Sequence, residues 1–237
     1  MTIDPPLGRP VDWTPARRPD RAELIGAHVA LRPLRIADAE ALHAASTDPT
    51  IWTYLTYGPY ASVADMRERL ASIADSDDPL FFAVLRDGVP QGVASYLRIE
   101  PEQGTIEIGH IWFGTPLQRT TAATEAIFLL ARHAFDDLGY RRLEWSCNAL
   151  NARSRRAAER FGFTFEGVFR NAMVAKGRNR DTAWHSITVE DWPGIRAAFE
   201  HWLDPENFDA DGAQRRPLQA PISSISSATE STTREGR

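Results

Sequence analysis

Cysteine is almost absent from this sequence: Cys147 is the only one in 237 residues. A disulfide framework or a CxxC metal site within one chain is therefore excluded, and no other cluster has metal-ligand spacing. No apolar run is long enough for a membrane-spanning helix. The first residues, MTIDPPLGRP, lack the basic and apolar regions of a secretory signal. We expect a cytoplasmic protein without a metal and without a membrane partner.

An excess of positive charge is also lacking, since the formal net charge is −5 at pH 7. General nucleic-acid-binding proteins carry a basic excess, so we expect no nucleic-acid partner. Hydrophobic residues make up 43% of the chain and charged residues 25%, which are values typical of a globular protein with a sizeable core. A monomer and a homodimer are both compatible with this composition.

Composition divides the chain into three segments. Residues 1–22 contain five prolines interleaved with charge, which predicts an extended arm. Residues 209–237 are rich in Ser, Thr and Ala and have no helical stripe, which predicts a disordered tail. The segment between them, 23–208, is predicted to be one folded domain.

Hydrophobic periodicity within 23–208 predicts alternating strands and helices. The predicted strands are 28–34, 80–85, 93–99, 105–113, 142–147, 163–175 and 181–189, and the predicted helices are 36–47, 62–75, a helix opening near 121, 151–161 and 191–203. Hairpin signals join the second, third and fourth strands, whereas a helix separates 105–113 from 142–147 and implies that these two are parallel. The fold class is therefore α/β (an α+β layered domain), with a mixed, mostly antiparallel sheet and helices on both faces.

The segment LQRTTAATEA (117–126) opens the third long helix and contains no glycine. A helix N-terminus presents unpaired N–H groups and partial positive charge, which suit a pyrophosphate. The small side chains from Thr120 to Ala123 would allow close approach, and Arg119 adds charge. Simple capping of the helix by a threonine is the alternative.

Two motifs resemble the GNAT acetyltransferases. Gln118-x-x-Thr121-x-Ala123 is similar to the family's pyrophosphate motif Gln/Arg-x-x-Gly-x-Gly/Ala, and the TEA that follows is typical of the Rim-type branch, the ribosomal-protein N-terminal acetyltransferases. NARSRRAAERFGFTFEGVFR (151–170) is similar to the second signature of that branch. The resemblance covers residues 22–190 and implies the GNAT fold. Thr121 replaces the motif glycine, which would be costly for a β-branched residue if this position requires a positive φ.

The resemblance also implies a binding site for acetyl-CoA. The strand 105–113 would bind the pantetheine arm through its backbone, the turn would bind the pyrophosphate, and the next helix would contribute an asparagine to the pantetheine and an arginine to the 3′-phosphate. The residues in question are Ile111, Trp112, Phe113, Gln118, Arg119, Thr120, Thr121, Ala122, Ala123, Thr124, Asn151 and Arg156. Helix capping by Asn151 and a solvated arginine face are the alternatives.

Glu107 is the predicted general base. It lies on a half-buried strand, 11 residues before Gln118, an offset that resembles the base of histone-acetylating relatives. Burial would raise its pKa towards that of a useful base, although a cross-strand ion pair is the alternative. Ser154 is the predicted acid for the departing thiolate. His110 would face away from Glu107 on a regular strand, and a bulge would change that.

The acceptor is predicted to lie beside IWTYLTYGPY (51–60), an aromatic loop, with the turn KGRNRD (176–181) opposite. The predicted acceptor-contacting residues are Trp52, Tyr54, Tyr57, His110 and Trp184. An aromatic loop pinned to the core is the alternative interpretation. The sequence thus predicts an acetyl-CoA-dependent N-acetyltransferase acting by direct attack on a protein N-terminus or a small amine. The alternatives are a detoxifying, antibiotic-type acetyltransferase and a non-catalytic CoA-binding module.

Overall fold

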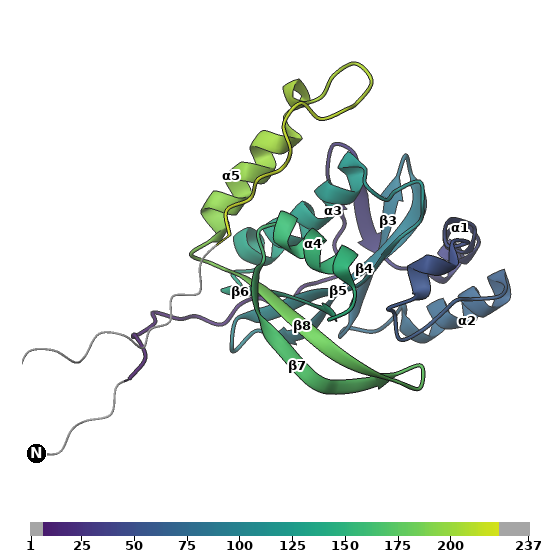
Figure 1. The fold of residues 1–237 in the computed structure, drawn as a ribbon, viewed down its shortest axis with the longest axis horizontal. Coiled ribbons are helices and arrows are strands. Elements are labelled where there is room, and N and C mark those ends of the chain that lie inside the picture. The colour runs from purple at the N-terminus through teal and green to yellow at the C-terminus, as the bar shows by residue number, and fades with distance from the viewer. Residues whose placement is uncertain (1–6, 223–237) are drawn as a thin grey trace, which may run out of the picture.

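The centre of the fold is an eight-stranded sheet with the spatial order β1-β2-β3-β4-β5-β6-β8-β7 (Figure 1). The structure is a computed structural model and describes residues 7–222. The strands are β1 (Leu24–Ile25), β2 (Ala30–Pro33), β3 (Leu80–Arg86), β4 (Val89–Glu100), β5 (Thr105–Phe113), β6 (Arg142–Asn148), β7 (Thr164–Ala175) and β8 (Arg178–Thr188). Only β5 and β6 pair in parallel among these, and every other neighbouring pair is antiparallel. The predicted mixed sheet and its parallel pair are confirmed.

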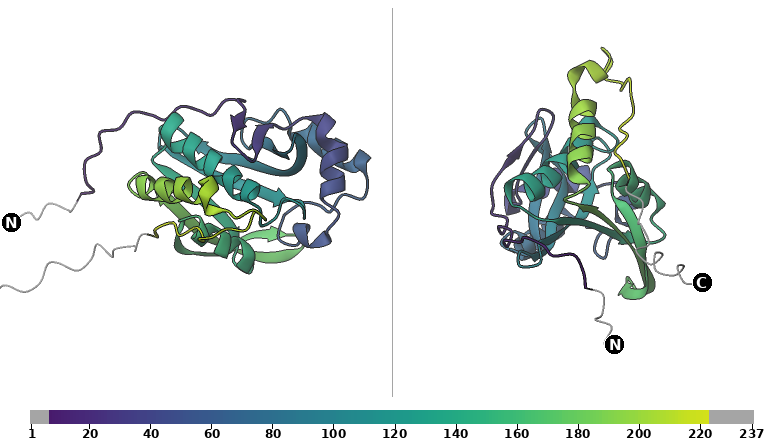
Figure 2. Two further views of the ribbon diagram at one scale, coloured as in Figure 1. Left: turned by 90° about the horizontal axis from the view of Figure 1, so that it is seen from above. Right: turned by 90° about the vertical axis from the view of Figure 1, so that its left-hand side faces the viewer.

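Helices cover both faces of this sheet (Figure 2). They are α1 (Ala39–Ala45), α2 (Val63–Ile73), α3 (Thr121–Arg132), α4 (Ala152–Arg160) and α5 (Trp192–Leu203). Short 3-10 turns occur at Ile36–Asp38, Pro49–Trp52 and Pro205–Asn207, and π-helical turns at His133–Asp137. The larger core lies between the sheet and the helices α3, α4 and α5, whereas α1 and α2 build a smaller core on the opposite face.

The helix α3 is almost entirely buried, as its apolar stripe predicts. Ile127 and Leu130 lie in the larger core together with Ile106 and Ile108 of β5. This packing fixes the start of α3 directly beyond the end of β5. The position of the candidate turn therefore depends on the core rather than on the turn itself.

Several predicted boundaries differ from the structure, and the short strand β1 was not predicted. The predicted helix 36–47 is a 3-10 turn followed by the shorter α1, and β4 is longer than the predicted strand 93–99. The predicted turn 176–181 is smaller, because β8 already begins at Arg178. Arg180 is consequently a strand residue, in register with Met173 of β7.

Both terminal segments are attached to the domain. In the arm, Ala16 and Arg17 donate backbone hydrogen bonds to the carbonyl oxygens of Pro101 and Leu138 at 3.1 and 2.8 Å. At the other end, Leu218 is buried in the larger core, so the packed part of the chain continues past residue 208. This corrects the predicted tail for residues 209–222, since Leu218 offers an apolar side chain to the core. The rest of the predicted tail, 223–237, lies outside the described residues.

Candidate functional site

The strands β5 and β6 separate within the sheet. They pair only at Thr105–Arg142, Ile106–Leu143 and Glu107–Glu144. Beyond this point β5 continues beside β4 as far as Phe113, and β6 continues beside β8 as far as Asn148. From Ile108 onwards, the backbone edge of β5 that faces β6 therefore has no strand partner. A gap of this kind leaves backbone donors and acceptors available to an extended ligand.

The turn between β5 and α3 presents unpaired amides. Thr120 caps α3, and its Oγ1 accepts a hydrogen bond from the Ala123 N–H at 3.1 Å. Among the described residues, the N–H groups of Arg119, Thr120, Thr121 and Ala122 donate to no acceptor of the protein. Capping and an anion-binding turn, the two alternatives for this sequence, thus coexist here.

The turn adopts its shape without the motif glycine. The left-handed residue is Arg119, with φ at +62°, and Thr121 begins the helix with no positive φ. Threonine at 121 is therefore unstrained. Hydrogen bonds from Gln118 Nε2 to the Phe113 carbonyl and from Thr120 Oγ1 to the Leu117 carbonyl, each 2.7 Å long, hold the turn against the end of β5.

Glu107 lies where β5 and β6 part, and its side chain is only 2% exposed. Its Oε1 accepts hydrogen bonds from Ser146 Oγ at 2.7 Å and from the Ser146 N–H at 3.2 Å, and its Oε2 pairs with Arg98. Burial raises the pKa of Glu107 above its ordinary value, while the charge of Arg98 and the Ser146 hydrogen bonds act in the opposite direction. Glu107 thus has the raised pKa that the sequence predicted, and it also forms the ion pair that was the alternative.

Arg98 reaches Glu107 because β4 is irregular at this point. The register with β5 shifts between Leu97 and Glu100, and Arg98 has φ at +49°. The Asp78 carboxylate fixes this bulge by accepting the N–H groups of Arg98 and Ile99 at 3.0 and 3.1 Å. The Arg98 guanidinium carbon lies 4.7 Å from the centre of the Trp184 ring. Sequence reasoning missed Arg98, since regular alternation contains no signal for this bulge.

His110 lies on a second bulge. Two residues of β5 stand between the pairs Ser95–Gly109 and Val93–Trp112, and His110 has φ at +50°. Its ring lies 5.2 Å from that of Phe81 and 5.7 Å from that of Tyr57. Phe81 belongs to the core under α1 and α2, the face of β5 from which Ile106 and Ile108 point away. His110 therefore shares the face of Glu107, unlike the expectation for a regular strand.

The aromatic loop divides into core and wall residues. Trp52 is 2% exposed, and its Nε1 donates to the Ser46 carbonyl at 3.2 Å. The prediction that Trp52 contacts the acceptor is corrected accordingly, because its indole is enclosed by Tyr57, Tyr60 and Trp112. Tyr57 is half-buried and Tyr54 is exposed. Burial also raises the pKa of Tyr57.

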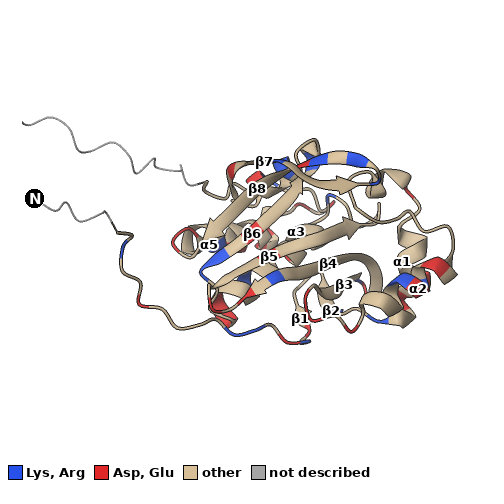
Figure 3. Ribbon diagram, turned by 90° about the horizontal axis from the view of Figure 1, so that it is seen from below, with Lys and Arg blue, Asp and Glu red and all other residues tan. Residues whose placement is uncertain are grey.

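The β7–β8 hairpin connects to this loop across the open face of the sheet. Lys176, the only lysine of the sequence, donates from Nζ to the Trp52 carbonyl oxygen at 2.8 Å. Figure 3 shows basic residues on the hairpin and on α2, the elements at either side of this face. Trp184 of β8 stacks on the guanidinium of Arg98, which pairs with Glu107. The Lys176 hydrogen bond joins the tip of the hairpin to the aromatic loop, and the acceptor site between them stays a prediction.

The start of α4 is held by local hydrogen bonds. Asn151 caps the helix by accepting the Ser154 N–H at 3.1 Å, which is the alternative role considered for it. Ser154 Oγ accepts a hydrogen bond from Trp145 Nε1 at 3.0 Å and remains partly exposed. Arg156 is exposed. Ser154 Oγ thus accepts from the indole, and its hydroxyl also hydrogen-bonds to Cys147.

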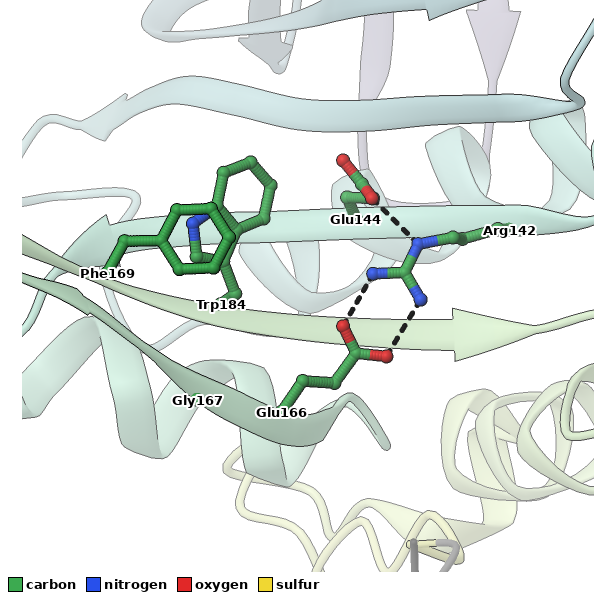
Figure 4. A pocket seen from close by; sticks show the side chains of 6 residues that line it. All are labelled: Arg142, Glu144, Glu166, Gly167, Phe169 and Trp184. Carbon is green, nitrogen blue, oxygen red and sulfur yellow. Dashed lines mark hydrogen bonds and ion pairs between the residues drawn. The ribbon is translucent and has the colours of Figure 1, made fainter. Parts of the chain in front are cut away.

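A cavity of about 210 Å³ continues the same face of the sheet (Figure 4). It is lined by Arg142, Glu144, Glu166, Gly167, Phe169 and Trp184. Arg142 pairs with Glu144 at 2.7 Å and with Glu166 at 2.5 Å. One arginine therefore faces two carboxylates, and these three side chains carry a net charge of one negative unit. Within residues 7–222 no group of His, Cys, Asp or Glu side chains is placed to hold a metal ion. No helix of that part of the chain has the length and apolar character that crossing a bilayer requires.

Comparisons with known proteins agree on one family. Residues 28–164 match the family model described as "Acetyltransferase (GNAT) domain". A GCN5-related N-acetyltransferase from Brucella melitensis is 47% identical, with a TM-score of 0.85 over 87% of this chain and 96% of that one. A GNAT-family protein of Chromobacterium violaceum ATCC 12472 is 38% identical, with a TM-score of 0.74 over 81% and 99%. A Bacillus subtilis (strain 168) protein provisionally named ribosomal N-acetyltransferase YdaF is 24% identical over 72% of this chain and 96% of its own.

Proposed function

Because the chain belongs to the GNAT acetyltransferase family, and so is an acyl-transferring enzyme with relatives of the Rim type, we propose that it transfers an acetyl group from acetyl-CoA to a primary amine by direct attack. The observation that carries this proposal is the arrangement around the gap in the sheet. Free backbone amides stand at its end, and the buried carboxylate of Glu107 stands at its vertex. The acceptor is a protein N-terminus or a small amine.

The described residues fit acetyl-CoA. The four unpaired N–H groups from Arg119 to Ala122 suit the pyrophosphate, because a helix N-terminus favours an anion. The unpartnered edge of β5 between Ile111 and Phe113 offers backbone groups to the amide bonds of the pantetheine arm. Arg156 is exposed on α4 and available for the 3′-phosphate. The thioester of acetyl-CoA supplies the acetyl group, and CoA departs as its thiol.

Glu107 is the general base of this proposal. The amine must lose a proton when its nitrogen bonds to the acetyl carbon and the carbon–sulfur bond breaks. A carboxylate whose pKa is raised by burial accepts such a proton more readily than an exposed one. Since Glu107 is almost fully buried, a water molecule in the gap relays the proton. Arg98 and Ser146 hold the carboxylate in a fixed orientation.

Ser154 is the proposed donor to the departing thiolate. Its Oγ is partly exposed at the start of α4, and its acceptor position is engaged by Trp145 Nε1. The hydroxyl proton is therefore directed away from the indole. Cys147 is buried and its burial raises its pKa, which disfavours the thiolate that an acyl-cysteine intermediate needs. Direct attack by the amine is consistent with this.

The test follows thiol release from acetyl-CoA in the presence of a panel of amines and N-terminal peptides. We expect turnover with the native chain and a loss of at least ~100-fold in kcat in Glu107→Gln, with acetyl-CoA affinity retained. Glu100→Gln, which alters an exposed glutamate on the neighbouring strand, is the matched control. Acetyl-CoA binding without turnover on any acceptor would favour the non-catalytic module, and an unaffected Glu107→Gln variant would remove the proposed base.

A further inference from the structure

Three arginines from three different elements surround His110. Arg69 comes from α2, Arg98 from β4 and Arg180 from β8. The guanidinium carbon of Arg69 lies 5.0 Å from the centre of the Tyr57 ring, which itself lies beside His110. Burial and the charges of all three arginines lower the pKa of His110 to about 4. The wall of the open face is therefore strongly basic and the imidazole is neutral.

Two of these arginines have no anionic partner. Among the described residues, Arg98 pairs with Glu107, whereas neither Arg69 nor Arg180 lies within ion-pair distance of any carboxylate. The Nε atoms of Arg69 and Arg180 are buried and have no hydrogen-bond partner. Burying a charged donor without an acceptor is unfavourable for stability.

A neighbouring aromatic side chain also has a buried N–H group without an acceptor. Trp184 Nε1 is buried without a hydrogen-bond partner. Burial raises the pKa of the Tyr60 hydroxyl, and the charge of Arg69 and its hydrogen bond to Tyr60 act in the opposite direction. Trp184 is on the same face of β8 as Arg180, since the two are four residues apart and every second side chain of a strand points the same way. Three buried N–H groups without an acceptor, those of Arg69 Nε, Arg180 Nε and Trp184 Nε1, thus lie on this side of the site.

We propose that the acceptor amine carries an oxyanion, a carboxylate or a phosphate, which binds between Arg69 and Arg180 while the amine is directed towards Glu107. Guanidinium groups match both oxyanions in geometry, and two of them neutralise one ligand charge with charge to spare. This inference rests on the proposed acetyl transfer and specifies its substrate class. Amines without an anionic group, such as most aminoglycoside-like bases, are poor acceptors.

Other cations of the site do not offer the same binding position. Arg142 is already neutralised by Glu144 and Glu166 in the adjoining cavity (Figure 4). Lys176 is engaged with the Trp52 carbonyl. The phosphates of acetyl-CoA are accommodated at the turn before α3, which packs on the opposite face of the sheet from α2 and Arg69. The Arg69–Arg180 pair is thus left for the acceptor.

The test uses matched pairs of acceptors that differ only in the anion. Hexapeptides with Asp or Glu at the second and third positions are compared with their Asn or Gln counterparts, and phosphoethanolamine is compared with ethanolamine. For the preferred pair we expect kcat/KM to be at least ~10-fold higher with the anionic acceptor, as charge-assisted hydrogen bonds imply. The peptide pair reports a carboxylate ligand and the ethanolamine pair a phosphate ligand.

Substitutions of Arg69 and Arg180 test whether these two residues cause the preference for anionic acceptors. In Arg69→Gln and Arg180→Gln the preference for the anionic acceptor should fall towards unity through a higher acceptor KM, with the KM of acetyl-CoA unchanged. Arg67→Gln and Arg170→Gln are matched controls, because both side chains are exposed on the same two structural units. Equal rates within every pair, or a preference kept in both variants, would overturn the inference while leaving acetyl transfer intact. Absence of acetylation with all acceptors, charged and neutral, would instead overturn the proposed function and this inference with it.

Discussion

The Oε1 atom of Glu107 accepts a hydrogen bond from Ser146 Oγ at 2.7 Å across the point where β5 and β6 part. The two residues are far apart in the sequence, and α3 lies between their strands. The parallel pairing of the two strands ends at Glu107 and Glu144, two residues before Ser146, so Ser146 has no main-chain partner on β5. The carboxylate takes the place of that partner and accepts the Ser146 N–H as well, at 3.2 Å.

The first prediction concerns the pH dependence of catalysis. Arg98 lowers the pKa of Glu107 against the larger effect of burial, so Arg98→Met should raise that pKa further. A base works only when deprotonated, and the acidic limb of kcat/KM should therefore move to higher pH, by ~1 unit. Rate profiles at saturating acetyl-CoA would measure the shift. Arg170→Met, an exposed arginine on β7, serves as the control, and an unchanged acidic limb in Arg98→Met would contradict the assignment.

The second prediction concerns the glycine-free turn. Thr121 begins α3 with no positive φ, so Thr121→Gly should lower the free energy of unfolding by up to ~1 kcal/mol and should not tighten acetyl-CoA binding. Arg119 occupies the left-handed region, and Arg119→Gly should be neutral or stabilising by a similar small amount. Chemical denaturation of both variants distinguishes the positions. A marked gain in stability for Thr121→Gly would show that the turn is strained at 121 instead.

The third prediction concerns stability in acid. The pKa of His110 is lowered to about 4, so the unfolded chain binds a proton near pH 6.5 that the folded protein accepts only near 4. Protonation of His110 in the unfolded chain therefore does not affect the free energy of unfolding above pH 6.5. As the pH falls from 6.5 towards 4, it lowers the free energy of unfolding by at most ~3 kcal/mol. His110→Phe keeps the ring contacts with Tyr57 and Phe81 and should flatten this part of the pH dependence.

Urea unfolding at several pH values between 7 and 4 measures this slope for His110→Phe. His201→Gln, which removes an exposed histidine of α5, is the control and should keep the slope of the native chain. If both variants have the native slope, His110 is not the group that titrates.

The fourth prediction concerns the connection between the hairpin and the aromatic loop. Lys176→Met removes the hydrogen bond to the Trp52 carbonyl, so amide hydrogen exchange near the tip of the β7–β8 hairpin should become faster. Global stability should change by no more than ~1.5 kcal/mol, since one hydrogen bond is lost at the surface. The KM of the acceptor should rise and that of acetyl-CoA should not. Unchanged exchange in the hairpin would show that this contact does not hold the wall in place.

Local sequence signals predicted most of the helices and strands. The apolar stripe of α3, the Ser62 cap of α2 and the hairpin signals around β4 correspond to what the structure contains. They are readable because hydrophobic periodicity and capping depend on residues close in sequence. Tyr57 and Trp184 were assigned to the acceptor site on the family resemblance instead, and their contact with an acceptor stays a prediction.

The local sequence did not predict the β-bulges of β4 and β5 or the burial of Trp52. The irregular positions Arg98 and His110 reverse the facing that strict alternation predicts, and neither residue type nor spacing marks them. Trp52 was assigned to the acceptor site because it belongs to an aromatic loop, but Tyr57 and Tyr60 of that loop and Trp112 of β5 enclose its indole. Arg69 entered the site only because α2 packs beside that loop.

The sequence by itself determined the order of strands and helices, the parallel crossover around α3 and the turn with its capping threonine, since each of these follows from interactions between near neighbours in the chain. The tertiary structure alone decided where β5 and β6 separate, that Ser146 and Arg98 hold Glu107, and that Arg69 and Arg180 remain without an anion. These relationships join residues from different elements, and their energies depend on burial and charge at distances that no local pattern encodes.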